Sequence, residues 1–257
     1  MKFDAIPPIE LPQGQKCYFA SDFHFGIPNL TESIARERRV CAWFDSIQHD
    51  AHTLFLLGDL FDTWMEYKRV VPRGFTRFLG KLASLSDAGV HIVVFTGNHD
   101  LWMTTYFEQE LGATVYKQHK TLKINGKSLF IGHGDGISHL EKSYKRLKYI
   151  LHHPLCQYLY RCLHPDWGIA IADYFSRLGP KHKYANLAMQ TDEKEAQIDF
   201  AKQMLQHTHF DYFVFGHRHI PLSKELDNGA YLVNLGDWIS HDTYAVFDSQ
   251  ELVLKKY

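Results

Sequence analysis

The sequence predicts an α/β or α+β fold in which strands and helices form a layered sandwich. Five short apolar runs, rich in β-branched and aromatic residues, each stop abruptly at a cluster of polar residues. Helix-like segments separate the first three runs, so the first half alternates between strand and helix. Because the runs are apolar on both faces, we expect buried strands whose polar ends emerge at the edge of a sheet.

The expected elements follow in a regular order along the chain. The strand runs with their polar ends are CYFASDFH (17–24), TLFLLGDLFD (53–62), HIVVFTGNHD (91–100), SLFIGHGD (128–135) and YFVFGHRH (212–219). Segments at roughly 31–49 and 73–88 have helical periodicity and connect the first three strands. Near the end, GDWISHDTYAVFD predicts a loop followed by a final strand.

About seventy residues between the fourth and fifth runs have helical periodicity, interrupted by HHP, HPD and GPKHK. We therefore expect residues 1–257 to form a single domain with a helical lid insertion at 138–207. The first lid helix, HLEKSYKRLKYIL, has an apolar face and a basic face, formed by Leu140, Tyr144, Leu147 and Leu151 and by Lys142, Lys145 and Arg146. This pattern fits either ordinary packing onto the body or contact with a membrane surface and acyl chains.

Composition limits the possible functions. The chain has 257 residues, 45% of them hydrophobic, which is enough for a sizeable core. A net charge of -1 argues against a nucleic-acid partner. The four cysteines form no CxxC pair, and the N-terminus lacks the apolar core of a signal peptide. With no apolar stretch of about 20 residues, we expect a cytoplasmic protein, with a membrane-surface role still open.

The polar clusters at the strand ends contain candidate metal ligands. Ligand sites of open α/β sheets lie at the carboxyl ends of strands, so clusters far apart in sequence can converge. On a continuing strand, Asp22 and His24 would project from the same face. The candidate ligands are Asp22, His24, Asp59, Asn98, His133, His217 and His219. Seven oxygen and nitrogen donors suit two divalent ions that share one carboxylate, with manganese, iron or zinc more natural than calcium.

Glycine precedes several of these candidates and permits a tight backbone path. A single cluster such as GDLFD could equally be a turn. The order and number of the five clusters favour the metal site over five unrelated turns. A structural zinc site with four cysteines is excluded, because the spacing of the cysteines does not match one.

In this order, the motifs DFH, GDLFD, GNHD, GHGD and GHRH resemble the signature blocks of the calcineurin-like metallophosphoesterases, across residues 22–219. The resemblance implies a four-layer sandwich of two mixed sheets flanked by helices, and hydrolysis of phosphate esters or anhydrides. It also implies that Asp59 bridges two ions. One ion would be held by Asp22, His24, Asp59 and His219, and the other by Asp59, Asn98, His133 and His217.

Residues 99 and 100 suggest the catalytic chemistry. We expect a metal-bridging hydroxide to attack phosphorus, with the two ions lowering the pKa of the parent water. His99 would then assist the leaving group as a proton donor. Asp100 would orient the His99 imidazole by accepting a hydrogen bond.

The chain length, the helical insertion, GHRHIP and NLGDW are similar to the UDP-2,3-diacylglucosamine pyrophosphatases of lipid A synthesis. This resemblance implies a peripheral enzyme on the cytoplasmic face of the membrane. Its substrate would be a nucleotide-linked glycolipid, UDP-2,3-diacylglucosamine, cleaved to 2,3-diacylglucosamine 1-phosphate and UMP. We expect the lid to bind this substrate through Lys145, Arg146, Arg177, Leu147 and Leu151.

One departure from that family leaves alternatives open. Many members have arginine directly after the metal-binding asparagine, whereas this chain has His99. A nucleotide or cyclic-nucleotide phosphoesterase is one alternative, and its lid should enclose a polar pocket. A metal-bearing binding protein without catalysis is the other, and the full ligand set together with His99 argues against it.

Overall fold

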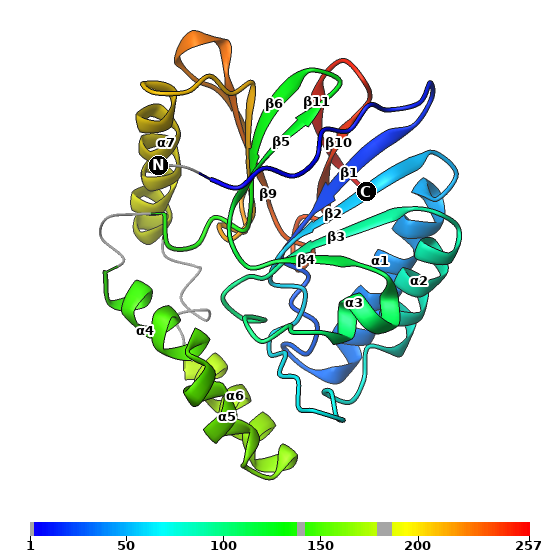
Figure 1. Cartoon of the computed structure of the whole chain (residues 1–257), viewed down its shortest axis with the longest axis vertical. Coiled ribbons are helices and arrows are strands. Elements are labelled where there is room, and N and C mark those ends of the chain that lie inside the picture. The colour runs from blue at the N-terminus through cyan, green and yellow to red at the C-terminus, as the bar shows by residue number, and fades with distance from the viewer. Residues whose placement is uncertain (1–2, 138–141, 179–186) are drawn as a thin grey trace.

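The computed structural model describes residues 3–137, 142–178 and 187–257, which form two sheets packed between helices (Figure 1). The first sheet has the strand order β11-β10-β1-β2-β3-β4. Strands β1 to β4 are parallel, while β10 pairs antiparallel with both β1 and β11. These strands are β1 (Lys16–Ala20), β2 (Ala51–Leu57), β3 (His91–Phe95), β4 (Thr114–Tyr116), β10 (Thr243–Phe247) and β11 (Leu252–Lys256).

The second sheet has the order β5-β6-β7-β9-β8, with β6, β7 and β9 parallel and the two edge strands antiparallel. Its strands are β5 (Lys120–Ile124), β6 (Lys127–Ile131), β7 (Tyr212–Phe215), β8 (Pro221–Glu225) and β9 (Tyr231–Leu235). Asn125 and Gly126 form the tight turn between β5 and β6, both with positive φ, as two-residue hairpin turns require. A short 3₁₀ turn, η2 (Asp227–Gly229), joins β8 to β9.

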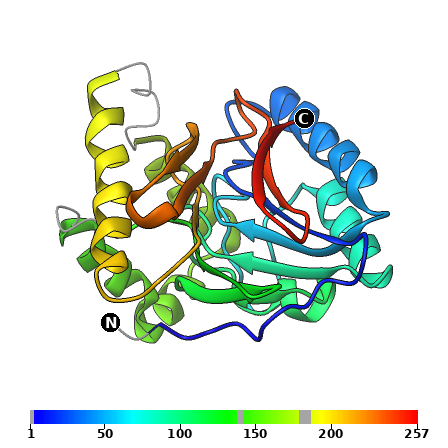
Figure 2. The ribbon, with the colours of Figure 1, turned by 90° about the horizontal axis from the view of Figure 1, so that it is seen from above.

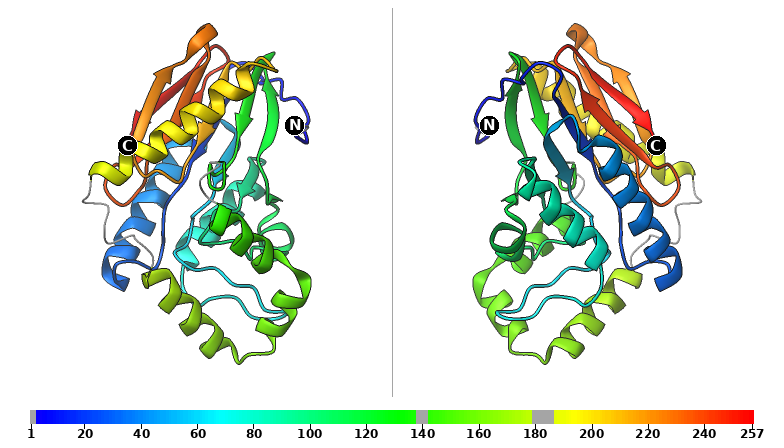
Figure 3. Two further views of the ribbon diagram at one scale, coloured as in Figure 1. Left: turned by 90° about the vertical axis from the view of Figure 1, so that its left-hand side faces the viewer. Right: turned by 90° about the vertical axis from the view of Figure 1, so that its right-hand side faces the viewer.

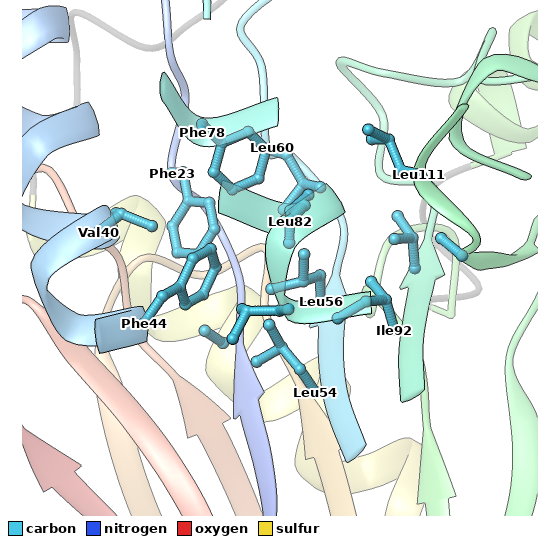
Figure 4. Packing of buried hydrophobic residues seen from close by; sticks show 14 of the residues in the cluster. Phe23, Val40, Phe44, Leu54, Leu56, Leu60, Phe78, Leu82, Ile92 and Leu111 are labelled. Atoms are coloured by element: carbon cyan, nitrogen blue, oxygen red, sulfur yellow. The ribbon is translucent and has the colours of Figure 1, made fainter. Parts of the chain in front are cut away.

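Three helices cover the outer face of the six-stranded sheet: α1 (Leu30–Ile47), α2 (Thr76–Asp87) and α3 (Tyr106–Leu111). The first two lie close to the segments predicted as helical. Helix α1 begins after Asn29, whose side chain accepts a hydrogen bond from the Glu32 amide. Figure 4 shows Phe23, Phe44 and Phe78 packed between this sheet and the helices, where all three are fully buried.

Two further cores complete a four-layer sandwich. The alternation of side chains along β1 places Tyr18 against the helices and Phe19 between the two sheets, where its ring stacks on Phe55 at 4.7 Å. On the far side, Phe130 and Phe215 pack with residues of helix α7 (Leu187–Leu205). Figure 2 shows α1 and α7 on opposite flanks of the sheets. The predicted fold class is confirmed.

The lid differs in extent from the predicted range 138–207. Helix α7 falls in that range, but Ala201 and its apolar neighbours pack on the five-stranded sheet, so α7 belongs to the body. The helices that stand away from the sheets are α4 (Lys142–His152), α5 (Pro154–Arg161) and α6 (Pro165–Leu178) (Figure 3). In the part of the chain that the structure describes, no helix has the length and apolar character needed to cross a bilayer.

Candidate metal centre

Five of the seven candidate ligands lie in loops that leave the strand ends in a strained conformation. Strand β1 ends at Ala20, so Asp22 and His24 do not continue a strand as predicted. Both have positive φ, of 56° and 44°, and so do Asp59, His217 and His219. Left-handed backbone costs about 1–3 kcal/mol at a residue other than glycine. Tight turns, rather than strand alternation, therefore aim these side chains at a common centre.

Two glycines allow the loops to approach one another closely. A Cβ on Gly97 would lie 2.3 Å from Asp59 Oδ1, and a Cβ on Gly216 would lie 2.4 Å from Asp22 Oδ2. Both distances are far below a van der Waals contact. Any side chain at these two positions would displace a candidate ligand, which explains why glycine precedes Asn98 and His217.

The seven candidate ligands converge into two groups that share Asp59. In the first group, ligand atoms of Asp22, His24, Asp59 and His219 lie within 4.8 Å of one another. In the second group, the same holds for Asp59, His133 and His217. The Oδ1 atom of Asn98 completes this group, at 3.1 Å from His133 Nε2 and 2.9 Å from His217 Nδ1.

Three of the imidazole rings are oriented by an oxygen on the side away from the centre. His24 turns Nε2 inward and Nδ1 toward Asp62 Oδ1, at 3.6 Å. His219 turns Nε2 inward and Nδ1 toward Asp237 Oδ2, at 3.3 Å. His133 directs Nδ1 to the Leu57 carbonyl, at 2.8 Å. Metal-binding histidines commonly have such an outer partner, which fixes the tautomer and the ring orientation.

The arrangement of lone pairs fits a cation. When His24 and His219 carry their protons on Nδ1, the nitrogen that faces a carboxylate, both Nε2 atoms carry lone pairs, and these atoms lie 3.1 Å apart. Two facing lone pairs repel each other unless a positive ion lies beside them. The donor set, imidazole nitrogens with carboxylate and amide oxygens, is the one that first-row divalent metals prefer.

The pKa values of the cluster are set by burial and, for His133, by the shared carboxylate. Burial lowers the pKa of His24 to about 3 and that of His217 to about 3, so both rings are neutral and able to bind metal. Burial acts in the same direction on His133, but Asp59 outweighs it and raises the pKa of His133 to about 10. Burial raises the pKa of Asp22 to about 6. The raised pKa of His133 shows that the shared carboxylate attracts positive charge, which a divalent ion would supply.

The expected role of Asp100 is wrong. Its two carboxylate oxygens accept hydrogen bonds from the backbone amides of Gly97 at 2.6 Å and Leu60 at 2.7 Å, and no contact joins them to the His99 ring. Asp100 therefore holds the GDLFD loop against the GNHD loop. The His99 ring instead lies beside Asp62, with Nδ1 at 3.0 Å from the Asp62 carbonyl and 4.0 Å from its carboxylate.

His99 lies at the rim of the cluster. Its side chain is 17% exposed, and Nε2 lies 4.0 Å from Asp59 Oδ2. Its backbone amide donates a 2.8 Å hydrogen bond to Asp59 Oδ1. His99 thus has two separate functions. Its backbone holds the shared carboxylate, and its partly exposed imidazole is accessible to a substrate.

The candidate substrate-binding residues of the lid are less closely grouped. Lys145 lines a cavity of about 280 Å³ that also reaches His133. Arg146 is exposed, and Leu147 is 52% exposed. Leu151 packs against the body, in contact with Met65, Leu101 and Trp102. Arg177 lies in α6 and Tyr144 in α4, but their side chains, like the whole of Leu140, are outside the described residues.

Three residues of the site were not assigned from the sequence. Asp62 and Asp237 stand in the motifs GDLFD and NLGDW, and each carboxylate orients a candidate ligand. The repeated pairing of an acid with a histidine ligand could have suggested both. Arg36 is buried in α1 and donates to the carbonyls of His24 and Ile27, which fixes the DFH loop. It looks like any other charged helix residue in the sequence.

Known proteins resemble this chain over most of its length. The family model for calcineurin-like phosphoesterases matches residues 16–221. A UDP-2,3-diacylglucosamine hydrolase of Porphyromonas gingivalis is 41% identical over 254 residues, which cover 93% of this chain and 97% of that protein. A hydrolase of the same name from Neisseria gonorrhoeae is 29% identical and covers 89% of this chain and 91% of its own. With the family model matching the chain from β1 to the first residue of β8, the chain belongs to the calcineurin-like phosphoesterases.

Proposed function

We propose that this chain hydrolyses the diphosphate of UDP-2,3-diacylglucosamine to 2,3-diacylglucosamine 1-phosphate and UMP. The observation that carries the proposal is the 41% identity, over nearly the whole of both chains, to a protein named UDP-2,3-diacylglucosamine hydrolase. The family supports the reaction class, a metal-dependent hydrolysis. No observation favours a nucleotide phosphoesterase or a binding protein without catalysis.

The metal cofactor would be a pair of divalent ions, with manganese the first candidate and iron or zinc the alternatives. Asp22, His24, Asp59 and His219 would hold one ion. Asp59, Asn98, His133 and His217 would hold the other. Two ions in such a site provide Lewis acidity toward the phosphate and a hydroxide nucleophile at neutral pH.

The chain itself would contribute positioning and proton transfer. The neutral amide oxygen of Asn98 limits the negative charge that faces the phosphate. The exposed edge of His99 can donate a proton or a hydrogen bond to a leaving oxygen, while its amide continues to hold Asp59 in place. Lys145, in the cavity beside His133, can offer positive charge to a phosphate.

The space beneath the lid supports a substrate with apolar chains. A cavity of about 530 Å³ lies between α6 and the body and extends to Asp62, at the edge of the metal centre. Its walls include Phe25, Ile27, Phe75 and Ile169, with Arg73 and Arg77 among the polar lining residues. Ligand pockets of this size typically combine apolar walls with a few polar groups. Each methylene buried there would contribute about 0.8 kcal/mol.

Exposed aromatic side chains on the lid helices support peripheral contact with a membrane. Tyr149, Tyr158, Trp167 and Phe175 are 75%, 66%, 68% and 66% exposed. Exposed apolar patches of this kind mark interaction sites. Arg146 is exposed on α4 and would face anionic head groups.

A substrate panel tests the function. The purified chain, loaded with Mn²⁺, is offered UDP-2,3-diacylglucosamine, the corresponding UDP-sugar without acyl chains and a simple aryl phosphodiester. We expect kcat/KM to be highest for the lipid, because the acyl chains gain contacts that the other two substrates lack. If the sugar without acyl chains is cleaved as efficiently, the lipid substrate is wrong and a nucleotide phosphoesterase takes its place.

A further inference from the structure

We propose that Asp62 is a positioning residue through which the lid controls the metal centre. The inference rests on the proposed two-metal site and adds a connection between that site and helix α6. Ser176 of α6 donates a hydrogen bond of 2.7 Å to Asp62 Oδ2. The other oxygen of the same carboxylate, Oδ1, faces His24 Nδ1 at 3.6 Å and His99 Nδ1 at 4.0 Å.

The position of Asp62 makes it suitable for this role. Its side chain is 8% exposed, and the His24 ring is 1% exposed, so the protein and not bulk water determines the orientation of both groups. His24 Nδ1 is buried and makes no hydrogen bond within the part of the chain that the structure describes, and Asp62 Oδ1 faces it from 3.6 Å, just beyond hydrogen-bond distance. A shift of this carboxylate toward or away from Nδ1 would therefore change the orientation and basicity of a candidate ligand.

Ser176 links this carboxylate to the lid. The hydroxyl comes from the last turns of α6, 114 residues away in sequence, and its contact with Asp62 forms when the helix packs on the body. The same packing brings Gly168 of α6 against the Tyr67 hydroxyl, so closely that a Cβ on Gly168 would lie 1.8 Å from that oxygen. Docking of the lid thus fixes Asp62, and Asp62 orients His24 and His99.

The coupling must be reciprocal. If the docked lid improves the geometry of a metal ligand, then metal binding must favour the docked lid by the same factor. This requirement gives two measurements that do not depend on turnover: Mn²⁺ affinity when the lid contact is altered, and lid protection when Mn²⁺ is added.

The first test is the affinity for Mn²⁺ alone, measured by titration calorimetry on the full chain. We expect Asp62→Asn to weaken Mn²⁺ binding at one of the two sites by roughly 10- to 100-fold, which is the usual effect of removing the outer partner of a metal-binding histidine. Ser176→Ala should weaken the same site by roughly threefold to tenfold, the value of one hydrogen bond. Ser46→Ala, which removes an exposed hydroxyl bonded to Trp43 on α1, is the matched control and should change nothing.

A double-variant cycle shows whether the two residues act as a unit. Ser176→Ala should have no further effect once Asp62→Ala removes the acceptor of the Ser176 hydroxyl. Unchanged Mn²⁺ affinity in Ser176→Ala, or effects of the two substitutions that multiply, would overturn the proposal. Should Asp62→Asn fail to fold, Ser176→Ala decides alone, because its hydroxyl lies on the lid and outside the sandwich.

The second test is amide hydrogen exchange of α6 with and without Mn²⁺. In the natural chain, we expect Mn²⁺ to slow amide exchange in α6. In Ser176→Ala, adding Mn²⁺ should leave the exchange rate of α6 unchanged. Equal slowing in both proteins would contradict the coupling. A chain that binds no Mn²⁺ at all would instead refute the proposed function, so the two failures are distinguishable.

Discussion

At the scale of single residues, Asp59 is where the two halves of the metal centre meet. One oxygen is held by the His99 amide, and the other lies 3.5 Å from His24 Nε2 and 3.3 Å from His133 Nε2. A carboxylate in this position can bind both ions, and no neighbouring side chain can replace it.

Asp59→Ala should therefore disturb both metal positions. We expect the protein to retain fewer than two Mn²⁺ per chain after dialysis and hydrolysis to slow by roughly 10²- to 10³-fold or more. Elemental analysis of the dialysed protein measures the metal content. Asp248→Ala, at an exposed turn, is the control. Loss of one ion with full turnover would contradict the bridging role.

The role of the His99 side chain can be tested without disturbing the metal ligands, because its backbone and its side chain have different contacts. His99→Ala keeps the amide that holds Asp59 and removes only the imidazole. We expect full metal content and hydrolysis slowed by roughly 10²- to 10⁴-fold, as for a lost proton donor. A series of aryl phosphodiesters measures this, and the deficit should shrink as the leaving group improves. An equal deficit across the series would point to electrostatic stabilisation instead.

At the scale of elements, the loops after β2 and β3 are joined by buried carboxylates. Glu66 is the clearest case, because Oε2 accepts hydrogen bonds from the amides of Thr105 at 2.8 Å and Tyr106 at 3.2 Å, at the start of α3. The cap residue Thr105 makes no such bond itself. Arg161 of the lid donates to the Glu66 carbonyl at 3.0 Å. The loop that caps α3 therefore also supports α5.

Glu66→Gln tests this cap and should destabilise the protein by about 1–2 kcal/mol at pH 7. Burial raises the pKa of Glu66, but the hydrogen bonds from residues 104 and 105 outweigh it and lower the pKa below the usual value. A lowered pKa in the folded state means that the carboxylate stabilises the fold above its unfolded pKa, near 4.3. That contribution is lost as the pH falls through the folded pKa.

Urea unfolding of both proteins at pH 7 and near pH 3 measures the effect. The difference between Glu66→Gln and the natural chain should shrink at the lower pH. Glu110→Gln, at an exposed position in the same short helix, is the matched control. A difference that is independent of pH would show that the charge of Glu66 does not contribute.

At the scale of the whole molecule, the sequence predicts the five strands that lead into the polar motifs, together with β10, and leaves out others. β1, β2, β3, β6 and β7 were found because each is an apolar run ending at a polar motif. The edge strand β8, with its exposed Ser223, Lys224 and Glu225, lacks such a signature, and so does the three-residue strand β4. Asn125-Gly126 is a hairpin signal that marks the turn after β5, but β5 itself leads into no polar motif.

The site was predicted unevenly for a related reason. Motifs identify the side chains that point at the centre, but the contacts that orient them depend on how loops from different strands pack. Asp100 was expected to serve His99, yet it binds the amides of Gly97 and Leu60, and Asp62 lies beside His99 instead. Sequence proximity is a poor guide where three loops meet, because a neighbour in the chain can face away.

The lid carries the last prediction, which concerns the membrane. Tyr158 of α5 and Trp167 of α6 are more than 60% exposed. Helices α4 and α5 also carry an open apolar groove of about 520 Å³, lined by Ile150, Leu155 and Leu159. Interfacial aromatic side chains bury in the boundary between head groups and acyl chains, at about 1.5–3 kcal/mol for a fully buried apolar side chain. Arg146, exposed on α4, would add about 1 kcal/mol on an anionic surface.

We therefore expect the full chain to sediment with vesicles of phosphatidylglycerol and phosphatidylethanolamine, and less with neutral phosphatidylcholine. The double variant Tyr158→Ser, Trp167→Ser should bind the anionic vesicles at least roughly tenfold more weakly, since each lost side chain removes apolar contact area. Tyr257→Ser, at a 48% exposed position in the body, is the matched control. Raising the salt should weaken the preference for anionic vesicles and spare the effect of the aromatic pair, because screening acts on charge alone. If the double variant and the natural chain sediment alike, the lid is not the membrane-contacting face, and its apolar surface must serve the substrate only.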